Sequence, residues 1–347
     1  MLTFEIFGNT DIGKKRSNNE DAFIAQTLWD DKHLLAVAID GVGGVESGEV
    51  AAQIAQTTII EYLKEYSNGE RLSLLVQSVI RANNTIFEER KVRRNCDRMA
   101  CVLTAALFDL NHGQLHLAHV GDTRLYCFDN HNQDIIKLSL DHSEVGYQED
   151  NGLLSEVEAM SHPHRNIIDR AVGMDLHGIS DLDFIDSQTF SLIPGATYLL
   201  CSDGLSDMLT KAEIVSVLNQ NISIEEKVPK LIDLANEKGG NDNITVVLVD
   251  IYGEIPAVQK DEDVFDSEQI ESKQPKETKG CPKWCCIALA FSCLLNGMFL
   301  GWYGHSAYIN CRTPAETQKD TLKVPLNDTV NFINSDTMII NTIDRNE

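Results

Sequence analysis

Basic residues are scarce in this sequence. Lysine and arginine together number 29 among 347 residues, against 53 aspartates and glutamates, and the formal net charge is −24. Because nucleic-acid binding depends on basic side chains that neutralise phosphates, nucleic acid is not an expected partner. An acidic excess by itself usually only keeps a protein soluble, so the positions of the acids matter more than their number.

The sequence also lacks a CxxC pair for zinc, a regular disulfide framework among its nine cysteines, and an apolar stretch near its N-terminus. These absences favour a reducing compartment, no secretory signal at the N-terminus and a cytoplasmic folded part. Hydrophobic residues make up 43% and charged residues 24%, which is typical of a globular domain with a sizeable core.

Short β-rich segments dominate the chain up to residue 252. Two long amphipathic helices are expected over Gly48–Tyr66 and Leu72–Arg90, a hairpin at Asn111–Gly113, and a flap of irregular structure with short helices over Asp141–Gly178. Grouped strands favour an α+β layer architecture rather than a doubly wound parallel sheet. The expected strands are Phe4–Gly8, Ala22–Thr27, Leu34–Ile39, Val102–Asp109, Leu115–Val120, Arg124–Phe128, Asp183–Phe190, Tyr198–Cys201 and Ile244–Ile251.

The composition changes after residue 252. Residues 253–283 are first acidic and then basic, which predicts a disordered linker. Trp284–Tyr303 has no charged residue and is long enough to cross a bilayer core of ~30 Å, which predicts one transmembrane helix. Lysines before it favour a cytoplasmic N-terminal domain, at the inner membrane if the protein is bacterial, with the polar tail 304–347 on the opposite side. The spacing of Gly297 and Gly301 is a weak indication of dimerisation.

Five short motifs place aspartates or glutamates at the ends of expected strands. Carboxylates that converge from separate strands raise one another's pKa unless cations lie between them. Oxygen ligands select Mg²⁺ or Mn²⁺ over softer ions. The motifs are Asn19-Glu20-Asp21, Asp40-Gly41-Val42-Gly43-Gly44, Gly121-Asp122-Thr123-Arg124, Ser202-Asp203-Gly204-Leu205 with Asp207, and Asn241-Asp242-Asn243.

Such a centre would carry out phosphoester chemistry. Two divalent ions that share a water can lower its pKa towards ~7 and present hydroxide to a phosphorus atom. Arg16, four residues before Glu20, has the planar guanidinium that binds phosphate oxygens in pairs. Taken alone, Arg16 is more often a solvated surface residue and each Asp-Gly pair more often a turn, so the prediction depends on the whole set.

The ordered set of motifs resembles the metal-dependent protein phosphatases of type 2C, in particular bacterial-type members, over about residues 4–252. The resemblance implies a four-layer sandwich of two antiparallel sheets flanked by helix pairs, and removal of phosphate from phosphoserine and phosphothreonine proteins, opposite a Ser/Thr kinase. It is carried by Arg16 to Phe23, Asp40 to Gly44 with Gly48 to Ala51, His119 to Arg124, Asp141 to Ser143, His162 to Asn166, Leu200 to Leu205 and Asp242 to Thr245.

The resemblance also implies a role for each motif residue. Asp40 would bridge two Mn²⁺ or Mg²⁺ ions, Asp203 and Asp242 would complete the first site, and Glu20 with the Gly41 carbonyl would hold the second.

Further positions would support this pair of ions. Arg16 would hold the substrate phosphate, Asp21 and Asn243 would back the cluster, and Ser143–Gly178 would form the flap beside it. A third ion would have the ligands Asp122, Asp203 and Asp207.

Two features depart from the resemblance or compete with it. Val42 stands where some members have a histidine proposed as general acid, so a water or the third site would have to protonate the leaving oxygen. His142, His162 and His164 are assigned no metal, because Mg²⁺ and Mn²⁺ prefer oxygen.

Three alternatives remain open. One is a catalytically silent phosphoprotein-binding module on a membrane stalk, against which the intact acidic set argues. Another is a small-molecule phosphoesterase, which would use the same metal chemistry. In the last, the tail 304–347 senses a signal that the phosphatase domain reads out.

Overall fold

The computed structural model describes residues 1–43, 47–93, 98–178, 181, 183–254 and 340–341. The expected membrane helix, and all but two residues each of the expected linker and tail, lie outside these ranges. Among the residues described, no helix is long and apolar enough to cross a membrane.

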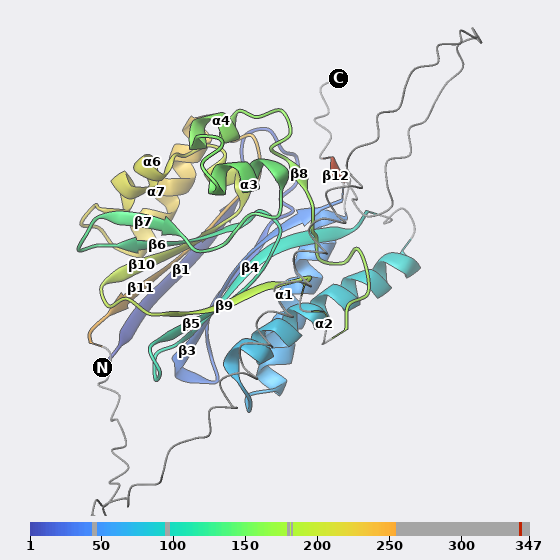
Figure 1. Cartoon of the computed structure of the whole chain (residues 1–347), viewed down its shortest axis with the longest axis horizontal. Helices are drawn as coiled ribbons and strands as arrows, with labels where there is room; N and C mark the ends of the chain where they lie inside the picture. Colours follow the sequence, from blue (N-terminus) through green and yellow to red (C-terminus); the bar gives the residue numbers. More distant parts are fainter. Residues whose placement is uncertain (44–46, 94–97, 179–180, 182, 255–339, 342–347) are drawn as a thin grey trace, which may run out of the picture. The chain divides into compact units, whose positions relative to one another are not determined.

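Two five-stranded antiparallel sheets form the centre of the domain (Figure 1). The first sheet has the order β1 (Thr3–Asp11), β11 (Ile244–Tyr252), β10 (Ala196–Cys201), β6 (Arg124–Asp129) and β7 (Asp134–Lys137). The second has the order β2 (Ala22–Leu28), β3 (Asp30–Val42), β4 (Ala100–Asp109), β5 (Gln114–Val120) and β9 (Asp186–Ser191).

A pair of helices covers the outer face of each sheet (Figure 1). α1 (Gly48–Glu65) and α2 (Arg71–Val92) pack on the second sheet, and α6 (Lys211–Leu218) and α7 (Ile224–Glu237) pack on the first. Strand β3 shows why its sequence is apolar throughout. Leu35, Val37 and Ile39 face the helices, and Leu34, Ala36 and Ala38 face the opposite sheet. Both faces of the strand are therefore buried, as in a sandwich core.

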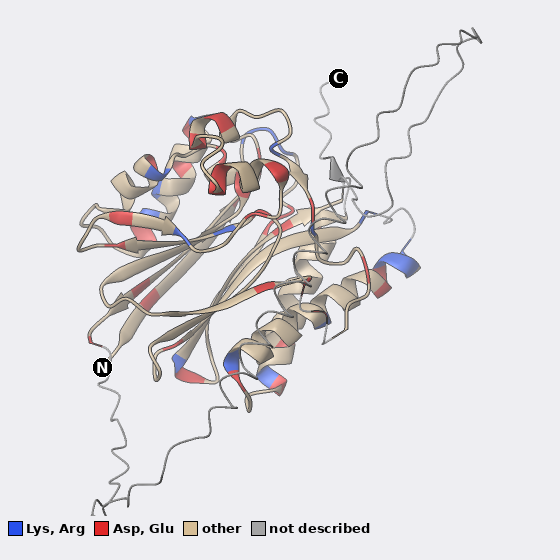
Figure 2. Ribbon diagram, viewed as in Figure 1, with Lys and Arg blue, Asp and Glu red and all other residues tan. Residues whose placement is uncertain are grey.

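The flap lies between β7 and β9. It contains α3 (Glu144–Asp150), α4 (Glu156–Met160) and the short β8 (Ile167–Ile168), which pairs with β12 (Ile340–Asn341). Ser155 and Glu158 form a capping box at the start of α4, which fixes where that helix begins. Figure 2 shows acidic residues on both flap helices.

The expected α+β sandwich of two antiparallel sheets flanked by helix pairs is confirmed. The hairpin at Asn111–Gly113 is also confirmed: it joins β4 to β5, and Gly113 has a φ of +63°, which favours glycine. The last expected strand before β10 begins three residues later than predicted, at Asp186 instead of Asp183.

Candidate metal centre

The acidic motifs meet at one edge of the sandwich because their strands end there. Asp40 and Gly41 lie near the end of β3, and β2 begins directly after Asp21, with Ala22 paired to Ile39. Asp203 opens the short helix α5 (Asp203–Ser206), just after β10. Asp242 lies two residues before β11, and Asp122 follows β5. Both sheets therefore contribute sequence-predicted acids to this edge of the sandwich.

The pKa values of these carboxyls are raised first by burial and then by mutual repulsion. Burial, together with Asp21, Asp203 and Asp242, holds the pKa of Asp40 well above its usual range. Burial and the neighbouring carboxylates act in the same direction on the pKa of Asp203. Burial raises the pKa of Asp21 to about 7 and that of Asp122 to about 7. Positive charge between these groups would allow all of them to ionise at neutral pH.

Side chains behind the cluster fix its geometry. Asn243 accepts a hydrogen bond from the Glu20 backbone N–H at 2.8 Å and donates to the carbonyl oxygens of Ile12 and Asn18 at 2.9 Å. Ser202 donates its hydroxyl to Asp21 at 2.8 Å. Asn243 and Asp21 are the positions expected to back the cluster, whereas Ser202 stands in a predicted motif but was given no role.

Glu20 and the Gly41 carbonyl converge on Gly48, the first residue of α1. A side-chain carbon added to Gly48 would lie 2.6 Å from Glu20 Oε2 and 2.6 Å from the Gly41 oxygen. Glycine at this position leaves room for the two oxygens, which are the pair expected to hold the second ion.

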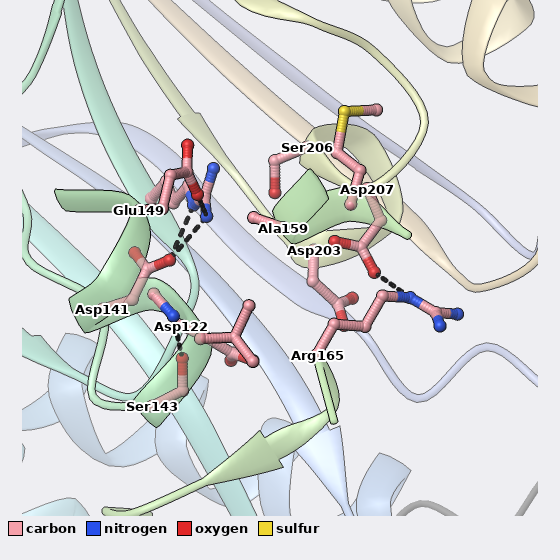
Figure 3. A pocket seen from close by; sticks show the side chains of 13 residues that line it. Asp122, Asp141, Ser143, Glu149, Ala159, Arg165, Asp203, Ser206 and Asp207 are labelled. Atoms are coloured by element: carbon pink, nitrogen blue, oxygen red, sulfur yellow. Dashed lines mark hydrogen bonds and ion pairs between the residues drawn. The ribbon is translucent and has the colours of Figure 1, made fainter. Parts of the chain in front are cut away.

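A pocket under the flap contains the expected third-ion residues. Its lining includes Asp122, Asp203 and Asp207, and burial raises the pKa of Asp207 to about 6. Figure 3 shows Asp203 and Asp207 on one side of this pocket and Asp141 and Glu149 on the other. Asp207 forms an ion pair of 2.9 Å with Arg165 of the flap, a partner that sequence reasoning missed.

The donor set fits hard divalent cations, although the side chains are not gathered around one point. In the described parts of the chain, no three histidine, cysteine, aspartate or glutamate side chains are grouped closely enough to hold an ion as they stand. Asp242 instead pairs with Arg16 at 2.6 Å. The donors are all oxygens, however, and Asp203 Oδ1 is buried with no hydrogen-bond partner among the described residues. A cation would satisfy this oxygen and offset the repulsion.

Arg16 lies beside the acidic motifs and pairs with one of them. Its side chain is 36% exposed, its guanidinium pairs with Asp242, and Asp203 and Asp40 are close enough to favour its charge. It is therefore a partly exposed cation next to several carboxylates.

Val42 and the flap histidines have structural environments. Val42 is buried and packs with Ala100, Val102 and Ile168, so its side chain belongs to a small apolar cluster. His142 Nε2 contacts Asp186 at 3.1 Å, and the rings of His162 and His164 pack edge to face.

Comparison with known proteins identifies the family. The family described as "Protein phosphatase 2C" matches residues 12–237. The chain belongs to the protein phosphatase 2C family. A relative from Listeria monocytogenes, named serine/threonine phosphatase stp, is 34% identical over 245 residues, which cover 70% of this chain and 93% of the relative. The resemblance seen in the motifs is thereby confirmed.

Solved structures agree with this membership. A serine/threonine phosphatase from S. agalactiae has a TM-score of 0.63 and 32% identity, covering 72% of this chain and all of the other. The catalytic domain of the phosphatase PstP, solved in complex with two manganese ions, has a TM-score of 0.62 and 29% identity, covering 73% of this chain and all of the other. Each of the two structures is thus matched over its full length by less than three quarters of this chain.

Proposed function

We propose that this phosphatase 2C chain removes phosphate from phosphoserine and phosphothreonine in proteins, with two Mn²⁺ or Mg²⁺ ions bound by Glu20, Asp40, Gly41, Asp203 and Asp242. The observation that carries the proposal is the convergence of carboxylates from both sheets, with raised pKa values, beside Arg16. It is supported by relatives that are named serine/threonine phosphatases and by the manganese complex of one of them.

Each residue has a task in this reaction. When bound, such a pair of cations supplies an activated water and offsets the charge of the phosphate. Arg16 exchanges its ion pair with Asp242 for the phosphate oxygens, which its guanidinium can bind in pairs. Asp40 would bridge the two ions, and Asn243 and Ser202 hold the loops that bear Glu20 and Asp21. Asp122 and Asp207 would complete a third, weaker site with Asp203.

The test is phosphate release by the full chain from a phosphothreonine peptide and from a nucleoside monophosphate. Each substrate is assayed with Mn²⁺, with Mg²⁺ and with chelator, beside Asp40→Asn and Asp203→Asn. Metal-dependent release from the peptide, lost in both variants, is expected. Faster release from the nucleotide would indicate a small-molecule phosphoesterase, and no release with any metal would indicate a silent binding module.

We further propose that residues 284–303 anchor the enzyme as a single-pass protein, with the catalytic domain in the cytoplasm. The uncharged segment, its flanking aromatics and the preceding lysines support this proposal. The proposal includes a contact between two such helices through Gly297 and Gly301, for which the sequence gives only a weak indication. Crosslinking of the full chain in membranes, compared with Gly297→Leu, tests the helix contact.

A further inference from the structure

The turn that carries Asp122 has a demanding backbone. Gly121 has a φ of +108°, and a side-chain carbon there would lie 2.2 Å from Val102 Cγ1. The turn therefore requires glycine, and contacts from the flap add to those that Thr104 makes with Thr123. The flap contacts come from Asp141 and His142, two adjacent residues at the beginning of the flap.

Asp141 holds the turn on its C-terminal side. Its Oδ2 accepts hydrogen bonds from Arg124 Nε at 2.9 Å and from Arg124 Nη2 at 2.6 Å. Its Oδ1 accepts from Lys137 Nζ at 3.1 Å. The side chains of Asp141, Arg124 and Lys137 are 3%, 11% and 6% exposed, so these contacts are shielded from water.

His142 holds the turn on its N-terminal side. The backbone N–H of His142 donates to the Gly121 carbonyl at 2.7 Å, and the Gly121 N–H donates to His142 Nδ1 at 3.1 Å. Since Nδ1 accepts a hydrogen bond, Nε2 carries the proton in the neutral ring. Nε2 lies 3.1 Å from Asp186 Oδ2, and Arg170 donates to the other oxygen of Asp186 at 2.9 Å.

The flap helix α3 is attached to the same turn. Its N-terminus is capped by Ser143, whose Oγ accepts from the Gly146 N–H at 3.0 Å. At its other end, Glu149 Oε2 accepts from Arg124 Nη2 at 2.7 Å. Residues of the helix and of the turn line the same pocket, among them Asp122, Arg124, Asp141 and Glu149. Figure 3 shows this pocket from close by. Movement of α3 and movement of the turn are therefore connected through Asp141 and Arg124.

We propose that Asp141 and His142 are positioning residues that clasp the turn around Asp122, and thereby link the flap to the third cation site. This inference rests on the proposed metal-dependent function. Neither residue contacts the reacting atoms; both act through Gly121 and Arg124. Interactions one step removed from a metal ligand commonly change metal affinity by about 10- to 100-fold. The same range applies to a clasp that orients Asp122.

The test is calorimetric Mn²⁺ binding to the full chain, with the melting temperature measured as a check on folding. His142→Ala is compared with Asp122→Ala and with the double variant. His142→Ala is expected to weaken, by about tenfold, the Mn²⁺ binding step that Asp122→Ala also weakens. The double variant should bind no more weakly than Asp122→Ala, because two residues that act on one site are not additive.

Two further variants sharpen the comparison. His142→Asn keeps an acceptor for the Gly121 N–H but cannot reach Asp186, and it should recover part of the lost affinity. His131→Ala, in the exposed turn after β6, is the matched histidine control and should bind Mn²⁺ as the wild type does.

The outcomes separate this inference from the proposed function. Additive losses in the double variant, or an unchanged Mn²⁺ affinity in His142→Ala, would overturn the clasp while the wild-type enzyme still releases phosphate. Wild-type protein that neither binds Mn²⁺ nor releases phosphate would overturn the proposed function itself. A nitrogen NMR spectrum that shows the proton of His142 on Nδ1 would also contradict the clasp.

Discussion

Arg16 illustrates at the scale of a single residue how one side chain can pair with a carboxylate and still serve a substrate. Its pair with Asp242 is 2.6 Å long but 36% exposed on the arginine side, so it adds little to stability. We expect Arg16→Ala to lower kcat/KM for a phosphothreonine peptide by about 100-fold while changing the unfolding free energy by less than about 0.5 kcal/mol. Steady-state kinetics and thermal melts measure both.

Arg16→Lys is the matched control for that change. Lysine keeps the charge but has one ammonium group instead of a planar guanidinium that binds two oxygens. Less than half of the lost activity, on a logarithmic scale of kcat/KM, should therefore be recovered. Full recovery by lysine would mean that only the charge matters at this position, and not paired contact with the phosphate.

Asp40 has opposite effects on folding and on catalysis. Burial and the carboxylates around Asp40 raise its pKa, so its ionised form weakens the metal-free fold as pH rises. In chelator at pH 8, Asp40→Asn should therefore unfold at a higher temperature than wild type. A gain of about 1 kcal/mol in the free energy of unfolding would raise the melting temperature by ~3 °C. With Mn²⁺ present the order should reverse, since only the wild type has the bridging carboxylate. A lower melting temperature for the variant in both conditions would contradict this prediction.

The residue types at the metal centre could be predicted from sequence, but most of their partners could not. Aspartates beside glycines at strand ends are visible as short motifs, and the structure places Asp40, Asp122 and Asp203 together. Arg165, in contrast, comes from the flap and meets Asp207 only through the fold, 42 positions away in sequence. No spacing rule connects such residues, although Arg165, Arg124 and Asp141 all lie inside motifs that the sequence shows.

At the scale of elements, the buried pair β4–β5 contains a histidine that makes folding sensitive to acid. His119 of β5 is fully buried, contacts Thr104 of β4 at 2.9 Å, and lies beside His142. Burial and His142 lower its pKa to about 4, although Asp141 and Asp186 act in the opposite direction. The unfolded chain therefore takes up a proton near pH 6.5 that the folded chain takes up only near pH 4.

It follows that neutral His119 contributes fully to the free energy of unfolding above pH 6.5. This contribution is lost as the pH falls from there towards 4. We expect His119→Asn to be less stable than wild type at pH 7.5 and to approach it at pH 5, in urea unfolding experiments. The difference in unfolding free energy between the two proteins should shrink by at most about 3 kcal/mol. Parallel stability curves over this range would contradict the prediction.

The central strands and first two helices were predictable because their apolar patterns are long. β3 and β4 are apolar on both faces, and α1 buries Ala51, Ala55, Ile59 and Leu63 at intervals of four. The edge strand β7 was not predicted, because its four residues, Asp134–Lys137, are half exposed and carry charges at both ends. α7 was not predicted either: Pro229 lies inside it and weakens a helical interpretation of its sequence.

At the scale of the whole molecule, the phosphatase domain makes up only part of the chain. The S. agalactiae structure is matched over its full length by 72% of this chain. We therefore expect residues 1–254 to fold alone and to retain peptide phosphatase activity within about twofold of the full chain, since both sheets and both helix pairs are complete. Kinetics of the two proteins under the same Mn²⁺ concentration make the comparison. A loss of more than tenfold would mean that the remainder of the chain takes part in the reaction.

The position of the C-terminal tail decides between two arrangements of the molecule. A membrane helix at 284–303 would place residues 304–347 on the side opposite the phosphatase domain. The pairing of β12 with β8 instead places Ile340 and Asn341 beside the flap. Both cannot hold at once in one molecule, and a ladder of two residues contributes little stability on its own.

We expect the membrane helix to prevail, because a run of some twenty uncharged residues favours the bilayer over water. Cys311 reports on it: in intact cells that express the full chain, a maleimide that cannot cross membranes should label Cys311, and Cys311→Ser should remove that label. The buried cysteines Cys101, Cys127 and Cys201 should stay unlabelled in the folded domain. Labelling of Cys311 only after permeabilisation would place the tail on the cytoplasmic side, where β12 can reach β8 and the flap beside the metal centre.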